Sequence, residues 1–522
     1  MGEARAAFGA GRFDAGLELL KQVLEAQPEH PQATHLMGYG LHAAGRLDEA
    51  LEWHRKGTRY PGVAGPSHYN MGCVYALQGK KDEAFAALAK AREAGFADRA
   101  LAENDADLAS LREDLRFDAF LKSFEPASPF PASVRVLHAI EGEAPGDQFG
   151  WIARKIGDVD GDGVSDFVTS APTKAQNGAA SGRVYVYSGR TGVKLWQRDG
   201  VAGSFLGMGL EAAGDVDGDG RGDVIAGAPG VGRGDSYALV LSGHDGRELL
   251  ELRSGESSDR FGRSVAGVGD LDGDGRAELL VGAPAAQDGG RAYLFSARGK
   301  RLVVFGADEA QDAFGSCVAG GAGLLVIGAK DAGAQKGGRV HVFAWRDGGA
   351  RPHFVIEGGD GAQELGAMFL SVAGDVNGDG TPDIYASDWA ANSRAQGAGR
   401  IHIHSGHDGV SLHTIAGQAP GEGFGIGPAR LGDWDGDGAD DFVVGAWQSR
   451  AAAVSGGRVA VHSGRTGAAL WEIPCSAANE TFGFDAEGLG DVNADGKTDL
   501  LITGAWSGCR GEKSGRVWIL SR

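Results

Sequence analysis

DVDGDGVSD, at residues 158–166, is the stretch that decides the fold, because the same nine-residue pattern returns five more times along the chain. Oxygen-bearing side chains stand at positions 1, 3, 5 and 9, and the glycine at position 6 permits the positive φ of a tight turn. Converging oxygens of this kind are what a hard cation such as Ca²⁺ requires. Position 12 holds no glutamate and an apolar run follows at once. The loop therefore differs from the helix-flanked EF-hand loop and is expected to join strands.

The other five copies keep the oxygen positions, with glutamate at position 9 of one copy and asparagine at position 3 of two. They are DVDGDGRGD at 215–223, DLDGDGRAE at 270–278, DVNGDGTPD at 375–383, DWDGDGADD at 433–441 and DVNADGKTD at 491–499. Six copies in register disfavour a chance set of surface turns. We predict up to six Ca²⁺ ions that fasten the fold and do not signal.

Composition places the chain among β-rich globular proteins. Its 522 residues include 90 glycines without a Gly-X-Y period, and 42% of the chain is apolar, so the glycines indicate turns. The formal charge of −20 disfavours nucleic acid or an anionic membrane as a partner. No apolar stretch reaches the roughly 18 residues of a membrane span. The four cysteines lack CxxC spacing, and a Cys475–Cys509 disulfide remains an open alternative.

The N-terminal region repeats with a period of 34 residues, in GRFDAGLELL from 11, GRLDEALEWH from 45 and GKKDEAFAAL from 79. Period and pattern resemble the tetratricopeptide repeat family. The resemblance implies an all-α helix-turn-helix array with capping helices over residues 1–122, and a concave groove for a protein partner. The first repeat would begin before Met1, so we expect an incomplete N-terminus, and no signal peptide is recognised. Pro-rich residues 123–133 are expected to form a linker.

From residue 134 the chain is built of units of 52 to 58 residues, each with four strand-like runs. Four short antiparallel strands per unit are typical of a propeller blade. Each unit opens with an aromatic residue and glycine or an equivalent, at Phe149, Phe205, Phe261, Phe314, Leu365, Phe424 and Phe482. We predict an all-β seven-bladed propeller over residues 134–522, in which the strand at 134–141 completes the seventh blade and closes the ring.

The order FG, DxDGDGxxD, GAP and a Val/Tyr-rich strand resembles the FG-GAP repeat of integrin α chains. The resemblance implies that each metal loop joins the first and second strands of a blade and that ligands bind the opposite face. It also implies a metal ligand set, with main-chain carbonyls at position 7: Asp158, Asp160, Asp162, Val164 and Asp166; Asp215, Asp217, Asp219, Arg221 and Asp223; Asp270, Asp272, Asp274, Arg276 and Glu278; Asp375, Asn377, Asp379, Thr381 and Asp383; Asp433, Asp435, Asp437, Ala439 and Asp441; Asp491, Asn493, Asp495, Lys497 and Asp499.

Two features depart from a uniform repeat. The loops with Asn377 and Asn493 carry one charge less and are expected to bind Ca²⁺ more weakly. The fourth blade has only GGAG at 320–323 in place of the metal loop. We expect a tight hairpin there, without a cation.

Three tryptophans stand where earlier units carry the proline of GAP: Trp389, Trp447 and Trp506. This position places them on adjacent blades at the end opposite the loops. They are candidate ligand-binding residues, since an indole offers a large apolar area and one N–H donor to a sugar or a protein. The alternative is that each indole packs beneath its own loop.

No HExxH helix, GxSxG elbow or Walker loop is present, so the chain is predicted not to be an enzyme. The sequence indicates a non-enzymatic, calcium-stabilised binding or adhesion-type propeller whose face takes a protein or glycan, with a tetratricopeptide array for a second protein. The alternative is a polysaccharide-acting enzyme or lectin that uses the same face. The resemblance to integrin α chains implies an extracytoplasmic or cell-surface location.

Overall fold

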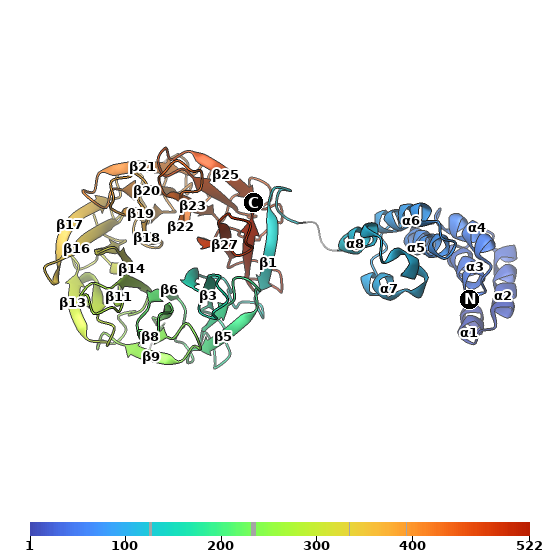
Figure 1. Cartoon of the computed structure of the whole chain (residues 1–522), viewed down its shortest axis with the longest axis horizontal. Helices are drawn as coiled ribbons and strands as arrows, with labels where there is room; N and C mark the ends of the chain where they lie inside the picture. Colours follow the sequence, from blue (N-terminus) through green and yellow to red (C-terminus); the bar gives the residue numbers. More distant parts are fainter. Residues whose placement is uncertain (125–127, 231–235, 334, 393) are drawn as a thin grey trace. The chain divides into compact units, whose positions relative to one another are not determined.

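The computed structural model describes residues 1–124, 128–230, 236–333, 335–392 and 394–522. The chain divides into two compact units, Met1–Ala127 and Ser128–Arg522. The first unit is helical and the second consists of four-stranded sheets arranged in a ring (Figure 1). The prediction of an all-α array followed by an all-β seven-bladed propeller is confirmed.

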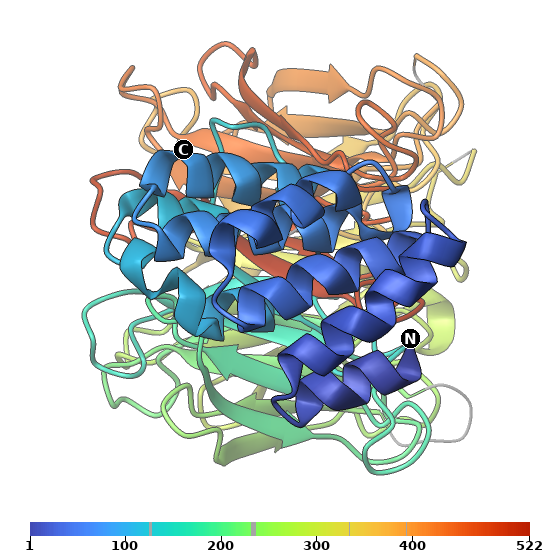
Figure 2. The ribbon, with the colours of Figure 1, turned by 90° about the vertical axis from the view of Figure 1, so that its right-hand side faces the viewer.

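The helical unit consists of successive helix pairs and a capping segment. Its elements are α1 (Gly2–Gly9), α2 (Phe13–Ala26), α3 (Pro31–Ala43), α4 (Leu47–Gly57), α5 (Pro61–Leu77), α6 (Lys81–Glu93), α7 (Arg99–Asn104), η1 (Ala106–Leu111) and α8 (Leu115–Lys122). Figure 2 looks onto these helices, which lie side by side. Gly11, Gly45 and Gly79 adopt φ of +72°, +74° and +73° between the helices of each pair, a conformation that glycine adopts without steric cost. The 34-residue period is thus the period of the helix pairs.

The propeller unit forms seven antiparallel sheets within the described residues. In chain order the strands are β1 (Arg135–Glu141), β2 (Ala153–Gly157), β3 (Asp166–Ala171), β4 (Arg183–Tyr187), β5 (Lys194–Asp199), β6 (Gly209–Gly214), β7 (Asp223–Ala228), β8 (Tyr237–Leu241), β9 (Glu248–Leu252), β10 (Ser264–Gly269), β11 (Glu278–Ala283), β12 (Arg291–Phe295), β13 (Arg301–Gly306), β14 (Phe314–Gly321), β15 (Leu324–Ala329), β16 (Arg339–Arg346), β17 (Gly349–Glu357), β18 (Leu370–Ala373), β19 (Asp383–Asp388), β20 (Arg400–His404), β21 (Ser411–Ala416), β22 (Phe424–Gly432), β23 (Asp441–Ala446), β24 (Arg458–His462), β25 (Ala469–Pro474), β26 (Asp485–Gly490), β27 (Asp499–Gly504) and β28 (Arg516–Ser521). A short helix, η2 (Gln287–Gly289), precedes β12.

The ring closes through its first and last strands, as predicted. β1 pairs antiparallel with β28, from Arg135 opposite Ser521 to Glu141 opposite Arg516, and the seventh sheet has the order β1-β28-β27-β26. This pairing covers an edge that would otherwise be exposed. Of the predicted linker, residues 125–127 lie outside the described residues. Phe130 packs in the core of the last two blades, with its ring centroid 4.8 Å from that of Phe482.

Burial explains why the inner strands are so apolar. The second strand of every blade is buried along its whole length, whereas fourth strands such as β5 and β9 consist mostly of exposed and half-buried residues. Hydrophobic clusters join neighbouring blades: one contains Val168 of the first blade and Val224 of the second. Burying apolar faces between blades is the main force that holds the ring together.

One predicted opening residue is displaced by one position. In the second blade Leu206 is fully buried and bridges Gly182, just as Phe424 bridges Gly399 in the sixth. The opening residue is therefore Leu206 and not Phe205. Both residues are apolar and precede Gly207, so the pattern alone chose the larger side chain.

Candidate functional site

The aspartate-rich loops all connect the first strand of a blade to the second. In the first blade Gly157 at the end of β2 lies opposite Asp166 at the start of β3, and the loop projects between them. The sixth blade repeats this with Gly432 opposite Asp441. Because the register is the same, the loops lie at one end of their blades.

Each loop is held in shape by its own carboxylates. Asp158 accepts hydrogen bonds from the main-chain N–H of Gly161 at 2.7 Å and of Gly163 at 2.8 Å. Asp166 accepts one from Val159 at 2.9 Å. The bond from position 2 to the position-9 carboxylate recurs in all six loops, at 2.7–2.9 Å. The sequence pattern thus specifies one compact turn six times.

The predicted position-7 residues also take part in this turn. Their main-chain N–H groups donate to the position-5 carboxylate in every loop, at 2.8–3.1 Å. The donors are Val164, Arg221, Arg276, Thr381, Ala439 and Lys497. This bond fixes the peptide plane that carries the position-7 residue.

The oxygens converge as a cation site requires. In four loops one carboxylate oxygen from each of positions 1, 3 and 9 lies within 4.8 Å of the others. The position-9 side chains are fully buried, and burial raises the pKa of Asp166, Asp223 and Asp383 to about 6. Glu278 Oε1 and Asn493 Oδ1 are buried without a hydrogen-bond partner among the described residues. Buried, crowded oxygens that lack partners fit a divalent cation.

The loops of the fifth and seventh blades differ from the other four. Asn377 donates to Asp379 at 2.9 Å, and Asn493 donates to Asp499 at 3.1 Å. Each amide thus turns its N–H₂ group toward a carboxylate. These loops have less negative charge to offer a cation, which fits the predicted order of affinities.

In four of the six loops the structure reveals a hydrogen bond to the next hairpin that sequence reasoning missed. The second oxygen of the position-9 carboxylate accepts the N–H of a glycine in the turn after the third strand, at 2.8–3.1 Å. These glycines are Gly189, Gly243, Gly406 and Gly464, and a Cβ on any of them would lie 1.9–2.0 Å from a carbonyl oxygen of the loop region. The recurring dipeptide Ser-Gly at these sites was the available signal.

The fourth blade confirms the predicted hairpin. β14 and β15 meet with Gly321 opposite Leu324, and Ala322 and Gly323 between them adopt φ of +49° and +81°. Two positive φ angles in a two-residue turn match the twist of the paired strands. The blade therefore closes without a metal loop.

The three predicted tryptophans lie at the other end of the blades and pack in one hydrophobic cluster. Trp447 is only 5% exposed, and its ring centroid lies 4.7 Å from that of Trp506 and 5.5 Å from that of Phe484. Trp389 and Trp151 pack against the same cluster. The indoles thus form one aromatic cluster across blades and not three separate platforms. The ligand-binding role of Trp389, Trp447 and Trp506 stays a prediction.

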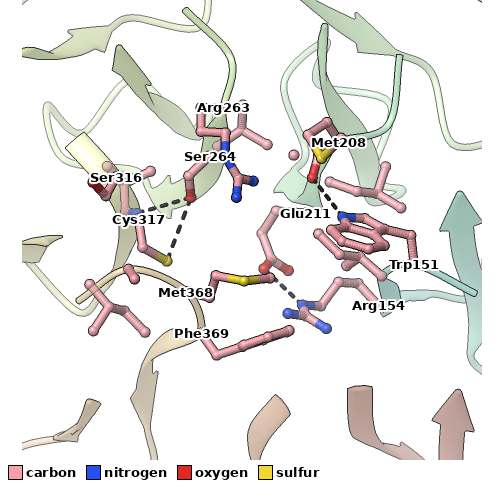
Figure 3. A pocket seen from close by; sticks show the side chains of 17 residues that line it. Trp151, Arg154, Met208, Glu211, Arg263, Ser264, Ser316, Cys317, Met368 and Phe369 are labelled. Carbon is pink, nitrogen blue, oxygen red and sulfur yellow. Dashed lines mark hydrogen bonds and ion pairs between the residues drawn. The ribbon is translucent and has the colours of Figure 1, made fainter. Parts of the chain in front are cut away.

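A hollow lies beside this cluster, lined by the first strands of several blades. Figure 3 shows Arg154, Glu211 and Arg263 pointing into it, with Trp151 and Phe369 on its wall. Arg154 Nε lies 2.9 Å from Glu211 Oε2. A further hollow of about 280 Å³ adjoins it and is lined in part by Arg154, Glu211 and Glu487. Charged groups from several blades therefore meet beside the aromatic cluster.

Two further features concern the cysteines and the length of the helices. Cys475 and Cys509 are both free thiols, so the structure contains no bond between them. Within the described residues, every helix is too short or too polar to cross a lipid bilayer.

Comparison with known proteins identifies both repeat types. The FG-GAP repeat matches residues 155–187, 211–241, 261–295 and 485–520, and a tetratricopeptide repeat matches residues 7–58. The chain is 32% identical to integrin alpha-PS5 of Drosophila melanogaster over 178 residues, 31% of this chain and 17% of that protein. It is 29% identical to integrin alpha-5 of Xenopus laevis over 220 residues, 37% of this chain and 21% of that protein. Integrin alpha pat-2 of Caenorhabditis elegans is 29% identical over 267 residues, which are 44% of this chain and 22% of that protein. The matches span only 17–22% of these relatives.

Proposed function

We propose that this FG-GAP repeat propeller with N-terminal tetratricopeptide repeats is a non-enzymatic binding protein of the adhesion type. Calcium ions held by the six loops stabilise the propeller. The opposite end of the blades presents the aromatic cluster to a protein or glycan, and the helical array binds a second protein. The similarity to integrin α chains supports an extracytoplasmic or cell-surface location.

One observation carries the proposal for the binding face. The indole Nε1 atoms of Trp389, Trp447 and Trp506 are all buried, and none has a hydrogen-bond acceptor among the described residues. A buried N–H without an acceptor costs about 1–3 kcal/mol. These donors can be satisfied only where the cluster opens to a water or a ligand oxygen, and the half-buried rings of Trp389 and Trp506 leave part of the cluster open to a glycan or a peptide.

The loops support a stabilising role for calcium more than a signalling role. Their hydrogen bonds are made within the loop, to the adjacent hairpin of the same blade, and in places to the loop of the neighbouring blade, as from Asp375 N–H to Asp440 Oδ2. At a roughly tenfold excess of free Ca²⁺ over Kd, each ion would add about 1.4 kcal/mol to the stability of the folded state. Several such ions would match the net stability of a typical domain.

The binding face can be tested with glycan and peptide arrays probed by the calcium-loaded full chain. We expect Trp389→Ala and Trp506→Ala to abolish binding. Trp196→Ala is the matched control, because this indole lies on β5 and already donates to Gly243 O at 2.7 Å. Equal binding by all three variants would contradict the proposed binding face. Binding to glycans and not to peptides would indicate that the protein is a lectin.

The helical unit offers apolar contacts for a second partner. Tyr39 on α3 and Leu77 on α5 are each 48% exposed, and exposed apolar side chains on stacked repeats are suited to binding a peptide. A peptide library displayed against the full chain tests this idea. We expect selected peptides to lose affinity for Tyr39→Ala and to keep it for Val193→Ala, an exposed apolar residue of the propeller.

An enzyme acting on polysaccharide is the second candidate, and the hollow beside the cluster is the reason to retain it. Burial raises the pKa of Glu487 to about 8, while Arg154 opposes that shift. A carboxyl group that is protonated at neutral pH and adjoins other carboxyls has the properties of a general acid. Release of reducing sugar by the wild type, lost in Glu487→Gln, would establish the enzyme and refute the non-enzymatic proposal.

A further inference from the structure

Four side chains with metal-binding atoms meet in the helical unit, far from the aspartate loops. They are His42 in the last turn of α3, Cys73 in α5, Asp105 at the N-cap of η1, and Asp107 within η1. Metal-binding atoms of Cys73, Asp105 and Asp107 lie within 4.8 Å of one another. His42 Nε2 lies 3.2 Å from Asp107 Oδ2. Three separate segments of the unit thus contribute to one cluster.

Two separations among these atoms are those expected between neighbouring ligands of a tetrahedral site. Zinc bonds of about 2.3 Å to sulfur and about 2.0–2.1 Å to nitrogen or oxygen place neighbouring ligands roughly 3.3–3.5 Å apart. Cys73 Sγ lies 3.5 Å from Asp105 Oδ2, and the His42–Asp107 separation of 3.2 Å is close to the same value. Cys73, Asp105 and Asp107 offer three ligand atoms within 4.8 Å of one another, whereas His42 is in contact with Asp107 alone among them and its ring must move toward the other two to complete a four-ligand site.

The orientation of His42 points to a shared ligand. Its Nε2 atom lies 3.2 Å from Asp107 Oδ2, so the imidazole and the carboxylate face each other as an ion pair. A cation bound there would take the place of the proton between them. The His42 side chain is 11% exposed.

Neighbouring groups hold the carboxylates as outer-sphere partners do. The hydroxyl of Tyr69 donates to Asp105 Oδ2 at 2.8 Å, and the main-chain N–H of Asp107 donates to Asp105 Oδ1 at 3.0 Å. Such bonds orient a ligating carboxylate. The Asp107 side chain is 37% exposed, which gives an ion a path from solvent.

We propose that His42, Cys73, Asp105 and Asp107 bind a transition-metal ion of the Zn²⁺ class. Cys73 would bind as the thiolate, and its proton would pass to solvent. A sulfur and an imidazole ligand favour such an ion over Ca²⁺, which takes oxygens alone. The ion fastens η1, which belongs to the capping segment, to two earlier helices.

Cobalt spectroscopy on the calcium-saturated full chain tests the site, because a thiolate bound to Co²⁺ gives a charge-transfer absorption that oxygen-only loops cannot give. We expect this band, with tetrahedral d–d bands, in the wild type and its displacement by Zn²⁺. Cys73→Ser should lose the band, whereas Cys317→Ser, which removes another buried thiol on β14, should keep it. Absence of the band in the wild type, or its survival in Cys73→Ser, overturns the proposal.

Asp107→Asn provides a second test in case the Cys73 variant misfolds, because the side chain of Asp107 is partly exposed and its replacement should disturb folding less. With circular dichroism equal to that of the wild type, this variant should bind Zn²⁺ about 10- to 100-fold more weakly in competition with a chromophoric chelator. Wild-type affinity in Asp107→Asn overturns the proposed ligand set. This outcome is independent of ligand binding by the propeller.

Discussion

Replacing Asp166 by asparagine separates the metal role of a loop from its hydrogen-bonding role. In the wild type the buried carboxylate accepts N–H bonds from Val159 at 2.9 Å, Asp160 at 3.2 Å and Gly189 at 3.0 Å. Asparagine keeps one acceptor oxygen and turns an N–H₂ group toward a main-chain donor. The lost and mismatched bonds cost about 1–3 kcal/mol whether or not calcium is bound.

A second effect opposes this loss only when calcium is absent. Burial raises the pKa of Asp166 from 3.8 to about 6. When the pKa of a carboxyl is higher in the folded state than in the unfolded state, the free energy of unfolding falls as the pH rises between the two pKa values. At pH 7 the charged side chain of Asp166 therefore costs the calcium-free protein about 3 kcal/mol. Asparagine avoids this cost, and the two effects nearly cancel. With calcium bound, the ion compensates the charge of Asp166 and adds at least about 1.4 kcal/mol that asparagine cannot provide.

The expected result is a variant that loses stability in calcium and little in chelator. Scanning calorimetry with Ca²⁺ and with EGTA measures this difference, and equilibrium dialysis should count one ion fewer. Asp160→Asn is the matched control, since it changes an exposed position-3 ligand and imitates the natural Asn377. Equal destabilisation of Asp166→Asn under both conditions, with an unchanged ion count, would refute the cation site and leave only a hydrogen-bonded turn.

Three further outcomes follow from the same geometry. Asn377→Asp should bind calcium in its loop roughly tenfold more tightly, measured by calorimetric titration, and unchanged affinity would contradict the charge argument. Gly189→Ala places a Cβ 2.0 Å from Ser165 O and should destabilise the propeller by about 1–3 kcal/mol with or without calcium, measured by thermal melting; wild-type melting would show that the turn can shift. Glu487 has a pKa of about 8 in the folded state and an ordinary value of 4.5. The free energy of unfolding should therefore fall as the pH rises between these values, by up to about 3 kcal/mol from about pH 5 to 7.5. Glu487→Gln should flatten that part of the pH–stability curve, and a persistent slope would assign it to other groups.

Features that depend on residues close in sequence could be predicted. Within the loop at 158–166 the carboxylates accept bonds from N–H groups at most seven residues away, so this part of its pattern is visible in the sequence, whereas the bond from Gly189 to Asp166 is not. The blades and helix pairs are visible for the same reason, since their periods are local. The displacement from Phe205 to Leu206 marks the limit of pattern reading, because only packing decides which of two adjacent apolar residues faces the core.

Features that join distant residues could not be predicted. Arg154 pairs with Asp485 across the closure of the ring, 331 residues apart, and the two meet only because seven blades complete a circle. His42 and Asp107 meet because helix pairs stack. Neither cluster has a spacing that identifies it, so the sequence indicated no site at either place.

The fourth blade shows how the metal loops differ from the aromatic cluster. It keeps its strands and its register with the two-residue turn at Ala322 and Gly323 in place of the loop, so the metal loop is not needed to form a blade. The metal loop is absent from the fourth blade, and in the other blades it bonds mainly to its own hairpin. A loop of this kind is suited to stabilising a single blade. The aromatic cluster has the opposite properties, because it draws Trp389, Trp447 and Trp506 from different blades and leaves their indole N–H groups without acceptors. A surface that needs several neighbouring blades to form depends on the packing of those blades, whereas a metal loop depends mainly on its own blade.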